Sequence, residues 1–419
     1  MTSTVPAAAQ REPADVALLT GDGARELIAQ ALAGQRAHVV DWQVHSVHHR
    51  PGAGVTVGYA ATVERPGHAP SEEYICATTA RLLNPTAPGL IPVATRERVV
   101  HVWLHPADPE LPGLATACDP ARLSAWIGSP VGVELLAYRP TRRAVVRVTS
   151  TVEGEAYLKV VRPEAAADLI ERHTTLTEAG VPAPRVLRTD PDGLVMLESG
   201  RGVPLANLLA QGLGDQAARV LDSLVSTLDA LPAAVMDLPR HPAWAERVDH
   251  YAHAAATVLP EHADRTSLLA QGVNELMASS DPGPVVPAHG DYYEANVLMD
   301  PRPGALAVST LLDVDSVGPG HRVDDLACML GHVSVLPHLA PQAYPHVPEA
   351  LETWTQACSA MVDEVALHAR CAAVVLSLVA GARRTDGGHW RSDAEGRLAR
   401  AEAWLARGRE LLAMRTSPR

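Results

Sequence analysis

Short runs of β-branched and apolar residues, separated by Pro and Gly turns, dominate the first half of the chain. Such runs are typical of strands, and the Arg-Pro-Gly turns at 50–52 and 65–67 separate two of them. The predicted strands are Val39–Val47, Val55–Val63, Tyr74–Thr79, Val99–Leu104, Val133–Tyr138, Ala144–Thr151 and Ala156–Val161. A short amphipathic helix is expected over Gly23–Ala33. From about Leu205 onward helical periodicity dominates, interrupted by a short β section around 296–314.

The β-rich half contains an internal repeat. The segment VHSVHHRPGAGVTVGYAAT at 44–62 resembles VELLAYRPTRRAVVRVTST at 133–151, each with an Arg-Pro turn followed by a strand. Each copy continues into a third strand, so each is a predicted three-strand meander. Chance similarity between two meanders is the alternative. If the repeat is real, Cys76 in the first copy stands where Lys159 stands in the second.

Composition narrows the classes of function. A chain of 419 residues with 47% hydrophobic residues predicts two or three folded domains. A net charge of −13 argues against a nucleic-acid binder. Five cysteines without a C-x-x-C pair, and the lack of a secretory pattern over Met1–Asp15, favour the cytoplasm. The most apolar stretch, Cys371–Ala382, is too short to span a bilayer, so we expect no membrane partner.

Lysine is almost absent from this chain. Of the 35 basic residues, all but Lys159 are arginine. Lys159 lies near the end of the predicted strand Ala156–Val161. In a composition so strongly biased toward arginine, a retained lysine indicates a site that requires a compact ammonium group. A codon bias that left one lysine by accident is the alternative.

The strongest chemical signal is HGDYYEANVL, which begins at His289. Asp291 followed five residues later by Asn296 is the spacing of a kinase catalytic loop, in which the Asp accepts a substrate proton and the Asn reaches a metal. Turn residues at 300–304 and a second apolar run then lead to Asp313, so a hairpin would deliver a further carboxylate. One carboxylate and one amide oxygen suit a magnesium ion that bridges nucleotide phosphates.

With this loop, the chain resembles the aminoglycoside phosphotransferase and choline kinase-like family, which shares the protein-kinase fold. The loop is similar to the family's H-G-D-x-x-x-x-N, Leu312-Asp313 to its metal-binding Asp, and Gly318–Ala327 to its G-x-x-x-x-D-L-A segment. The resemblance covers about 131–330 well and the C-terminal helices loosely. It does not cover the first 130 residues.

The resemblance implies a fold class and a division of the chain. We expect an α+β, two-lobed protein-kinase-like fold with an additional N-terminal β-rich module, whose meander resembles a duplicate of the small-lobe meander. The expected segments are a disordered tail over 1–20, a cap-like β-rich module over 21–130, an ATP-binding small lobe over 131–200, and a helical, catalytic and substrate-binding large lobe over 201–419.

The resemblance also implies roles in the catalytic loop. Asp291 would be the catalytic base, and His289 would support the loop by hydrogen bonds rather than react. Asn296 and Asp313 would hold magnesium. Asp325, in the D-L-A segment, would brace the loop as a structural residue.

For nucleotide binding, the resemblance implies that Lys159 pairs with a glutamate of the following helix to position the ATP phosphates. Glu171, in mid-helix, is preferred over Glu178, and a solvated surface glutamate is the alternative. The segment Leu197, Glu198 and Ser199 resembles the family's linker between lobes, where the backbone would bind adenine. The phosphates would be covered either by Thr141 or by Arg142, Arg143 and Arg147, and those arginines could equally form a solvated strand face.

The expected function is an ATP- and Mg-dependent phosphotransferase that phosphorylates a hydroxyl of a small molecule: an aminoglycoside, an amino alcohol or a sugar. GTP is left open as the donor. Glu294 adds negative charge beside the base and favours a cationic substrate, and Asp315 is a second candidate substrate contact. The N-terminal module suggests a maltokinase-like sugar kinase as one alternative. A catalytically silent nucleotide-binding protein is another, although the complete set of Lys159, Asp291, Asn296 and Asp313 argues against it.

Overall fold

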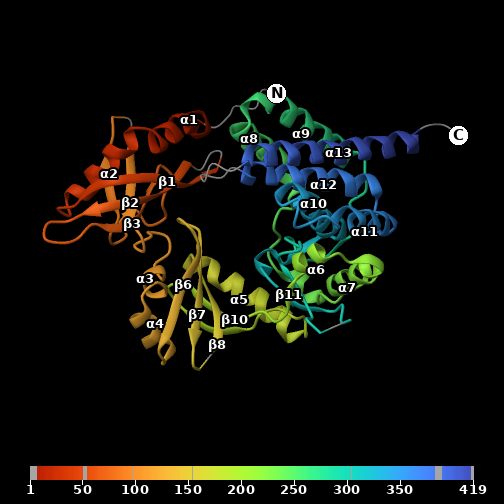
Figure 1. Cartoon of the computed structure of the whole chain (residues 1–419), viewed down its shortest axis with the longest axis horizontal. Helices are drawn as coiled ribbons and strands as arrows, with labels where there is room; N and C mark the ends of the chain where they lie inside the picture. Colours follow the sequence, from red (N-terminus) through yellow and green to blue (C-terminus); the bar gives the residue numbers. More distant parts are fainter. Residues whose placement is uncertain are drawn as a thin grey trace. The chain divides into compact units, whose positions relative to one another are not determined.

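The computed structural model of the chain describes residues 7–50, 54–96, 98–152, 154–302, 304–382 and 389–416. It divides into two compact units (Figure 1). The first contains Met1–Ala167 and Val186–Ser199, and the second contains Asp168–Arg185 and Gly200–Arg419.

The N-terminal part of the first unit is a five-stranded antiparallel sheet in the order β1-β2-β3-β5-β4. Its strands are β1 (His38–Arg50), β2 (Gly54–Glu64), β3 (Ser71–Thr78), β4 (Ile91–Ala94) and β5 (Val99–Leu104). Helices α1 (Ala7–Thr20) and α2 (Gly23–Ala33) contribute Leu19, Leu27 and Ile28 to the same hydrophobic core as the inward side chains of the sheet. Alternating apolar positions on β2 supply much of that core.

The second part of the first unit is another five-stranded antiparallel sheet, in the order β6-β7-β8-β10-β9. Its strands are β6 (Val131–Arg139), β7 (Arg143–Ser150), β8 (Gly154–Val161), β9 (Val186–Asp190) and β10 (Leu194–Glu198). Helices α3 (Leu114–Ala117) and α4 (Pro120–Ile127) pack on the face that carries Ala156, Leu158 and Val160. Helix α5 (Pro163–Glu178) follows β8.

The two sheets have the same topology, because the strand order of the second is that of the first advanced by five strands. The strands that flank the two Arg-Pro sequences also pair at matching positions: Arg50 pairs with Gly54, and Arg139 pairs with Arg143. This agreement supports a true repeat over two unrelated meanders.

The register corrects one detail of the expected repeat. Aligning the two Arg-Pro turns equates Thr56 with Val145. Thr56 pairs with Thr78 on β3, whereas Val145 pairs with Lys159 on β8. Thr78, and not Cys76, therefore occupies the position of Lys159. The two positions differ by two residues, so Cys76 and Thr78 lie on the same face of the sheet. The conclusion that the first copy lacks the ammonium group is therefore unchanged.

The second unit is mainly helical around one large core. Its α-helices include α6 (Leu205–Gln211), α7 (Ala217–Asp229), α8 (Val248–Val258), α9 (Ala263–Ala278), α10 (Arg322–Leu339), α11 (Val347–Met361), α12 (Glu364–Val379) and α13 (Trp390–Thr416). Its strands are short: β11 (Val203–Pro204), β12 (Val285–Ala288), β13 (Val297–Met299), β14 (Val308–Leu311) and β15 (Gly318–His321). They form a β11-β13-β14 sheet and a β12-β15 pair.

Helix α12 is the central core helix of this unit. Within the described residues, Glu364–Ala382 is the one helical segment long and apolar enough to cross a membrane, with a mean hydropathy of 1.8. However, 78% of that window is buried inside the protein. Its apolar character is therefore accounted for by packing in the core (Figure 1).

Two segments differ from the sequence-based expectation. Residues 7–20, expected in a disordered tail, form α1, and Leu19 is fully buried; residues 1–6 lie outside the described part. Residues 111–127, assigned to the N-terminal module, pack instead in the core of the second sheet. Neither segment has the long apolar run or strict alternation that would have revealed its partner from sequence.

Candidate active site

The catalytic-loop motif lies in the second unit, between β12 and β13. Gly290 begins the turn with a φ of +79°. A Cβ at this position would lie 2.7 Å from the Ser316 carbonyl oxygen, closer than real Cβ contacts. Both the backbone angle and the close approach require glycine here, which explains the Gly of the H-G-D motif.

The hairpin of β13 and β14 brings Asp313 to the catalytic loop. The Leu312 N–H donates to the Asn296 carbonyl oxygen at 2.8 Å. The Leu312 carbonyl oxygen accepts from His289 Nε2 at 3.1 Å. Asp313 itself has φ 49° and ψ 51°, a left-handed conformation that is uncommon for a residue other than glycine. Both backbone groups of its neighbour therefore fix Asp313 against the loop.

The His289 ring holds the loop together through two hydrogen bonds. It is fully buried, its Nε2–H donates to Leu312, and its Nδ1 accepts from the Asp291 N–H at 3.3 Å. These two bonds fix one neutral tautomer of the ring. The ring is used on both sides, so it holds the loop and is not placed to exchange protons with a substrate.

Asp325 ties the start of the loop to α10. Its two carboxylate oxygens accept from the backbone N–H groups of His289 (2.9 Å) and Gly290 (2.8 Å). Asp325 is 1% exposed, and this burial raises its pKa to about 6 even though the two N–H groups favour the charged form. These are the contacts that a loop-bracing residue requires.

Asp291 and Asn296 lie side by side. Asn296 Nδ2 donates to the Asp291 carbonyl oxygen at 2.9 Å and more weakly to Asp291 Oδ2 at 3.5 Å. Because the nitrogen end of the amide is used in this way, its oxygen faces another direction. Asn296 Oδ1 and the Asp313 carboxylate are hard oxygen donors, the type that magnesium prefers. The residues present thus fit a magnesium ion.

Glu294 lies at the inner side of the same loop. It is 6% exposed, and its Oε2 has no hydrogen-bond partner among the described residues. Burial raises the pKa of this carboxyl to about 7. Next to it, Tyr293 stacks on His332 at 4.1 Å between ring centroids. Asp315, in the short 3-10 helix η5 (Val314–Ser316), is half-buried two residues beyond Asp313.

The predicted nucleotide residues of the first unit lie on the second sheet. Lys159 is on the central strand β8, on the face opposite the α3–α4 core, and is half-buried. Leu197 and Glu198 end β10, Leu197 being buried, and the Ser199 hydroxyl donates to Glu155 at 3.1 Å. Their nucleotide contacts stay predictions.

Glu171 lies on the part of α5 that belongs to the second unit, and its side chain is exposed. Its proposed pairing with Lys159 is likewise still a prediction. Glu178, the competing candidate, is also exposed.

The family assignment rests on sequence and agrees with this geometry. Residues 141–357 match the phosphotransferase enzyme family, APH, over more than half of the chain. The chain belongs to this phosphotransferase family. No curated protein matches it significantly.

Several solved phosphotransferases and kinases are similar to this chain. A thermostable variant of aminoglycoside phosphotransferase APH(4)-Ia, in complex with ADP and hygromycin B, is 14% identical, covers 68% of this chain and 97% of its own, and has a TM-score of 0.48. A choline/ethanolamine kinase family protein from Mesorhizobium loti is 18% identical, covers 71% of this chain and 97% of its own, and has a TM-score of 0.44. APH(3'')-Id from Streptomyces rimosus, in complex with ADP and streptomycin, is 20% identical, covers 61% of this chain and 96% of its own, and has a TM-score of 0.42.

The family match confirms the recognition of the phosphotransferase family and, with it, the expected kinase-like fold class. This phosphotransferase is an enzyme that acts on a small molecule. The match to the family begins at residue 141, so the first sheet lies outside the matched region.

Sequence reasoning missed a buried arginine of the phosphotransferase. Arg172, 2% exposed, donates to the carbonyl oxygens of Val317 (2.9 Å) and Pro239 (3.1 Å) and lies 3.0 Å from His241 Nε2. It thereby ties α5 to the segment that follows Asp313. In an arginine-rich sequence an isolated Arg carries no signal, so only the fold could identify it.

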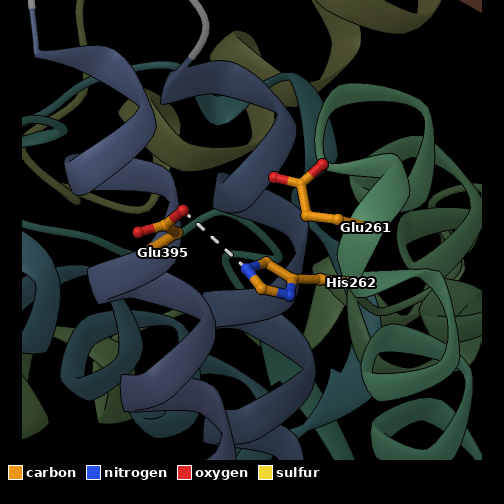
Figure 2. A group of neighbouring side chains, drawn as sticks. All are labelled: Glu261, His262 and Glu395. Atoms are coloured by element: carbon orange, nitrogen blue, oxygen red, sulfur yellow. Dashed lines mark ion pairs between the residues drawn. The ribbon is translucent and has the colours of Figure 1, made fainter.

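Outside the catalytic-loop segment, Glu261, His262 and Glu395 form a second group of acidic and histidine side chains (Figure 2). Glu261 and His262, in the 3-10 helix η4 (Pro260–His262), meet Glu395 of α13, with His262 Nε2 3.8 Å from Glu395. Arg391 pairs with Glu261, and Arg265 Nη1 lies 3.4 Å from His262 Nδ1. Because Arg391 already neutralises Glu261, and because the Arg265 guanidinium beside His262 pairs with Glu402, we interpret this group as a contact between helices and not as a metal site.

Proposed function

We propose that this phosphotransferase transfers the γ-phosphoryl group of ATP, with magnesium, to a hydroxyl of a small cationic molecule. The observation that carries the proposal is the convergence of Asp291, Asn296 and Asp313. Backbone hydrogen bonds through Leu312 and His289 hold the loop and the hairpin together. A turn with only a structural role would not require three unusual features together: the buried Asp325 carboxylate that holds the loop, the left-handed backbone of Asp313, and Gly290, where no other residue fits.

Each residue has a part in the proposed reaction. Asp291 orients the acceptor hydroxyl and accepts its proton as the oxygen attacks. Lys159 contacts the nucleotide phosphates through its ammonium group. His289 and Asp325 keep Asp291 in position and do not exchange protons with the substrate. Catalysis then rests mainly on positioning and on compensation of phosphate charge.

Asn296 Oδ1 and the Asp313 carboxylate would hold the magnesium ion. When bound, the ion supplies neutralisation of the negative charge on the phosphates. A retained Asn and Asp in this arrangement also argues against the catalytically silent alternative.

Glu294 supports a cationic substrate. A buried carboxylate oxygen without a partner is costly, and a positively charged group would compensate it. Amines such as aminoglycosides and amino alcohols supply such a group. A maltokinase-like sugar kinase is the second candidate, because the chain carries a complete additional sheet before the region that matches the family. The five free cysteines support a reducing location, for which we propose the cytoplasm.

The test is nucleoside diphosphate release from ATP or GTP with magnesium, over a panel of aminoglycosides, amino alcohols and sugars. Each acceptor is measured with wild type, with Asp291→Asn and with Asp300→Asn, a carboxylate control outside the catalytic loop, in the turn that follows β13. We expect acceptor-dependent ADP release that is lost in Asp291→Asn and kept in Asp300→Asn. Activity on sugars but not on amines would select the second candidate. Equal turnover in wild type and Asp291→Asn would overturn the proposal.

A further inference from the structure

The turn between β6 and β7 has an unusual centre. Thr141 has a φ of +61°, and a β-branched residue with positive φ is a clear outlier. Thr141 is also buried, with 7% of its surface exposed. Such a conformation persists only where the surrounding groups impose it.

Two side chains from outside the hairpin hold both backbone groups of Thr141. The Thr141 N–H donates to Asp108 Oδ2 at 2.8 Å, and the Thr141 carbonyl oxygen accepts from Arg162 Nε at 2.9 Å. Arg162 Nε also lies 3.4 Å from Glu110 Oε2. The turn is therefore clamped on both sides of its strained residue.

Asp108 is the centre of this clamp. It is 5% exposed, and its Oδ2 accepts a second hydrogen bond, from the Tyr138 hydroxyl at 2.7 Å. Its Oδ1 accepts from the Glu110 N–H at 2.9 Å. Three donors thus converge on one buried carboxylate. Burial raises the pKa of Asp108, although the same donors stabilise its charged form.

The clamp is continuous with the first sheet. Trp103, fully buried on β5, donates from its Nε1 to the Tyr138 hydroxyl oxygen at 3.1 Å. Cys76 Sγ on β3 lies 3.9 Å from the same oxygen. The chain leaves β5 at Leu104 and reaches Asp108 four residues later. The N-terminal sheet therefore provides the support from which Asp108 and Tyr138 hold the turn.

We propose that Asp108 is a positioning residue for nucleotide phosphate binding, through which the N-terminal sheet fixes the β6–β7 turn in its phosphate-covering conformation. This inference rests on the proposed function, since it requires a nucleoside triphosphate at Lys159. It also chooses between the two groups that the sequence left open. Thr141 is buried and both of its backbone groups are already used, so the arginines are favoured over Thr141. Arg147 pairs with Glu134, and Arg142 and Arg143 directly follow Thr141, so these two are the groups that reach the phosphates.

The test measures nucleotide affinity and not turnover. Isothermal titration of the full chain with magnesium and AMP-PNP is compared with titration by adenosine, which lacks phosphates. We expect Asp108→Ala to weaken AMP-PNP binding about tenfold, since a turn released from a strained conformation populates other states. Adenosine affinity should stay within about twofold of wild type. Tyr138→Phe removes one of the three donors to the carboxylate, together with the acceptor of the Trp103 Nε1–H, and should give a smaller loss with the same selectivity.

Two further variants separate positioning from general damage. Asp119→Ala removes a carboxylate that accepts two backbone N–H bonds at the start of α4 but does not touch the turn. It should leave both affinities unchanged. In Thr141→Gly the left-handed conformation needs no external support, so adding Asp108→Ala to that background should cost AMP-PNP binding about twofold and not tenfold.

The outcomes are distinct. A selective loss of AMP-PNP affinity in the Asp108 and Tyr138 variants, reduced in the Thr141→Gly background, supports the inference. Equal losses for adenosine and AMP-PNP, unchanged affinities, or the same selective loss in Asp119→Ala would overturn it. If Asp108→Ala does not fold, Tyr138→Phe decides by the same criterion. Wild type that binds no AMP-PNP would refute the proposed function itself, and this inference with it.

Discussion

The brace at Asp325 makes a quantitative prediction about pH and stability. Its carboxylate is buried and accepts two backbone N–H bonds, from His289 and Gly290. Its pKa is raised by burial from 3.8 to about 6. A shift of about 2 pKa units corresponds to about 3 kcal/mol between the two protonation states. Because the folded pKa is above the unfolded one, this contribution to stability is full below about pH 4 and is lost as the pH rises through 6.

Asp325→Asn removes the titration while keeping the shape. The amide oxygen can accept one of the two N–H bonds, and its NH₂ group then faces the other donor, which costs about 1–3 kcal/mol. At low pH the wild type should therefore be the more stable protein. Between pH 4 and 7.5, the advantage of the wild type should shrink by about 2–3 kcal/mol, since only its carboxyl group must ionise in a buried position.

The assay is urea unfolding of both proteins at intervals across pH 4–7.5, under identical ionic strength. The quantity compared is the difference in free energy of unfolding, so that every other titrating group cancels. If the difference between wild type and Asp325→Asn is constant over that range within about 0.5 kcal/mol, a span smaller than the predicted change, the buried carboxyl does not titrate as argued. Nucleotide affinity, measured alongside, should change less than kcat, because Asp325 holds the catalytic loop.

Further predictions concern single sites. Asp291→Asn should lower kcat by about 10²–10⁴ with nucleotide binding retained, the range for loss of a general base; steady-state kinetics and calorimetry give the two values. Lys159→Arg should weaken ATP binding or turnover although the charge is kept, since a planar guanidinium does not fit a site for a compact ammonium; wild-type values would show that one lysine survived by accident. Gly290→Ala should cost more than about 1 kcal/mol of stability and most of the activity, because the new Cβ meets the Ser316 carbonyl, and a wild-type melting temperature would contradict this. Calorimetric titration should find one ATP bound per chain, because the first sheet lacks a lysine at the position of Lys159.

The sequence was most informative where chemistry requires both residue type and spacing. The loop from Asp291 to Asn296 and the hairpin to Asp313 could be placed because a fixed interval separates two polar groups of defined roles. Strand β5 and helix α2 have the predicted bounds, since both are bordered by turn residues and have clear periodicity. The bounds of these segments could be predicted because they depend on interactions between residues that are close in sequence.

Other features could not be predicted because their causes are distant in sequence. Arg172 is fixed by carbonyl groups 67 and 145 residues away. Asp108 is a functional candidate only because Thr141 and Tyr138 come to it in the folded unit. In the sequence it is one of many Asp residues that precede a turn. Neither an isolated Arg nor an isolated Asp has a periodicity or a spacing that marks it.

The duplicated sheet shows how one topology supports two uses. Both copies have the same strand order and an Arg-Pro sequence between their first two strands, but the second has α5 between its third and fourth strands, where the first has a loop. At the position of Lys159 the first copy has Thr78, which is fully buried and shares a hydrogen bond of 2.7 Å with the Thr56 hydroxyl. Without an ammonium group and without the helix, the first sheet retains only its packing surface. That surface carries Trp103 and leads to Asp108, which holds the β6–β7 turn of the second sheet. If that turn covers nucleotide phosphates as we propose, the copy without the ammonium group supports the phosphate-binding turn of the other copy.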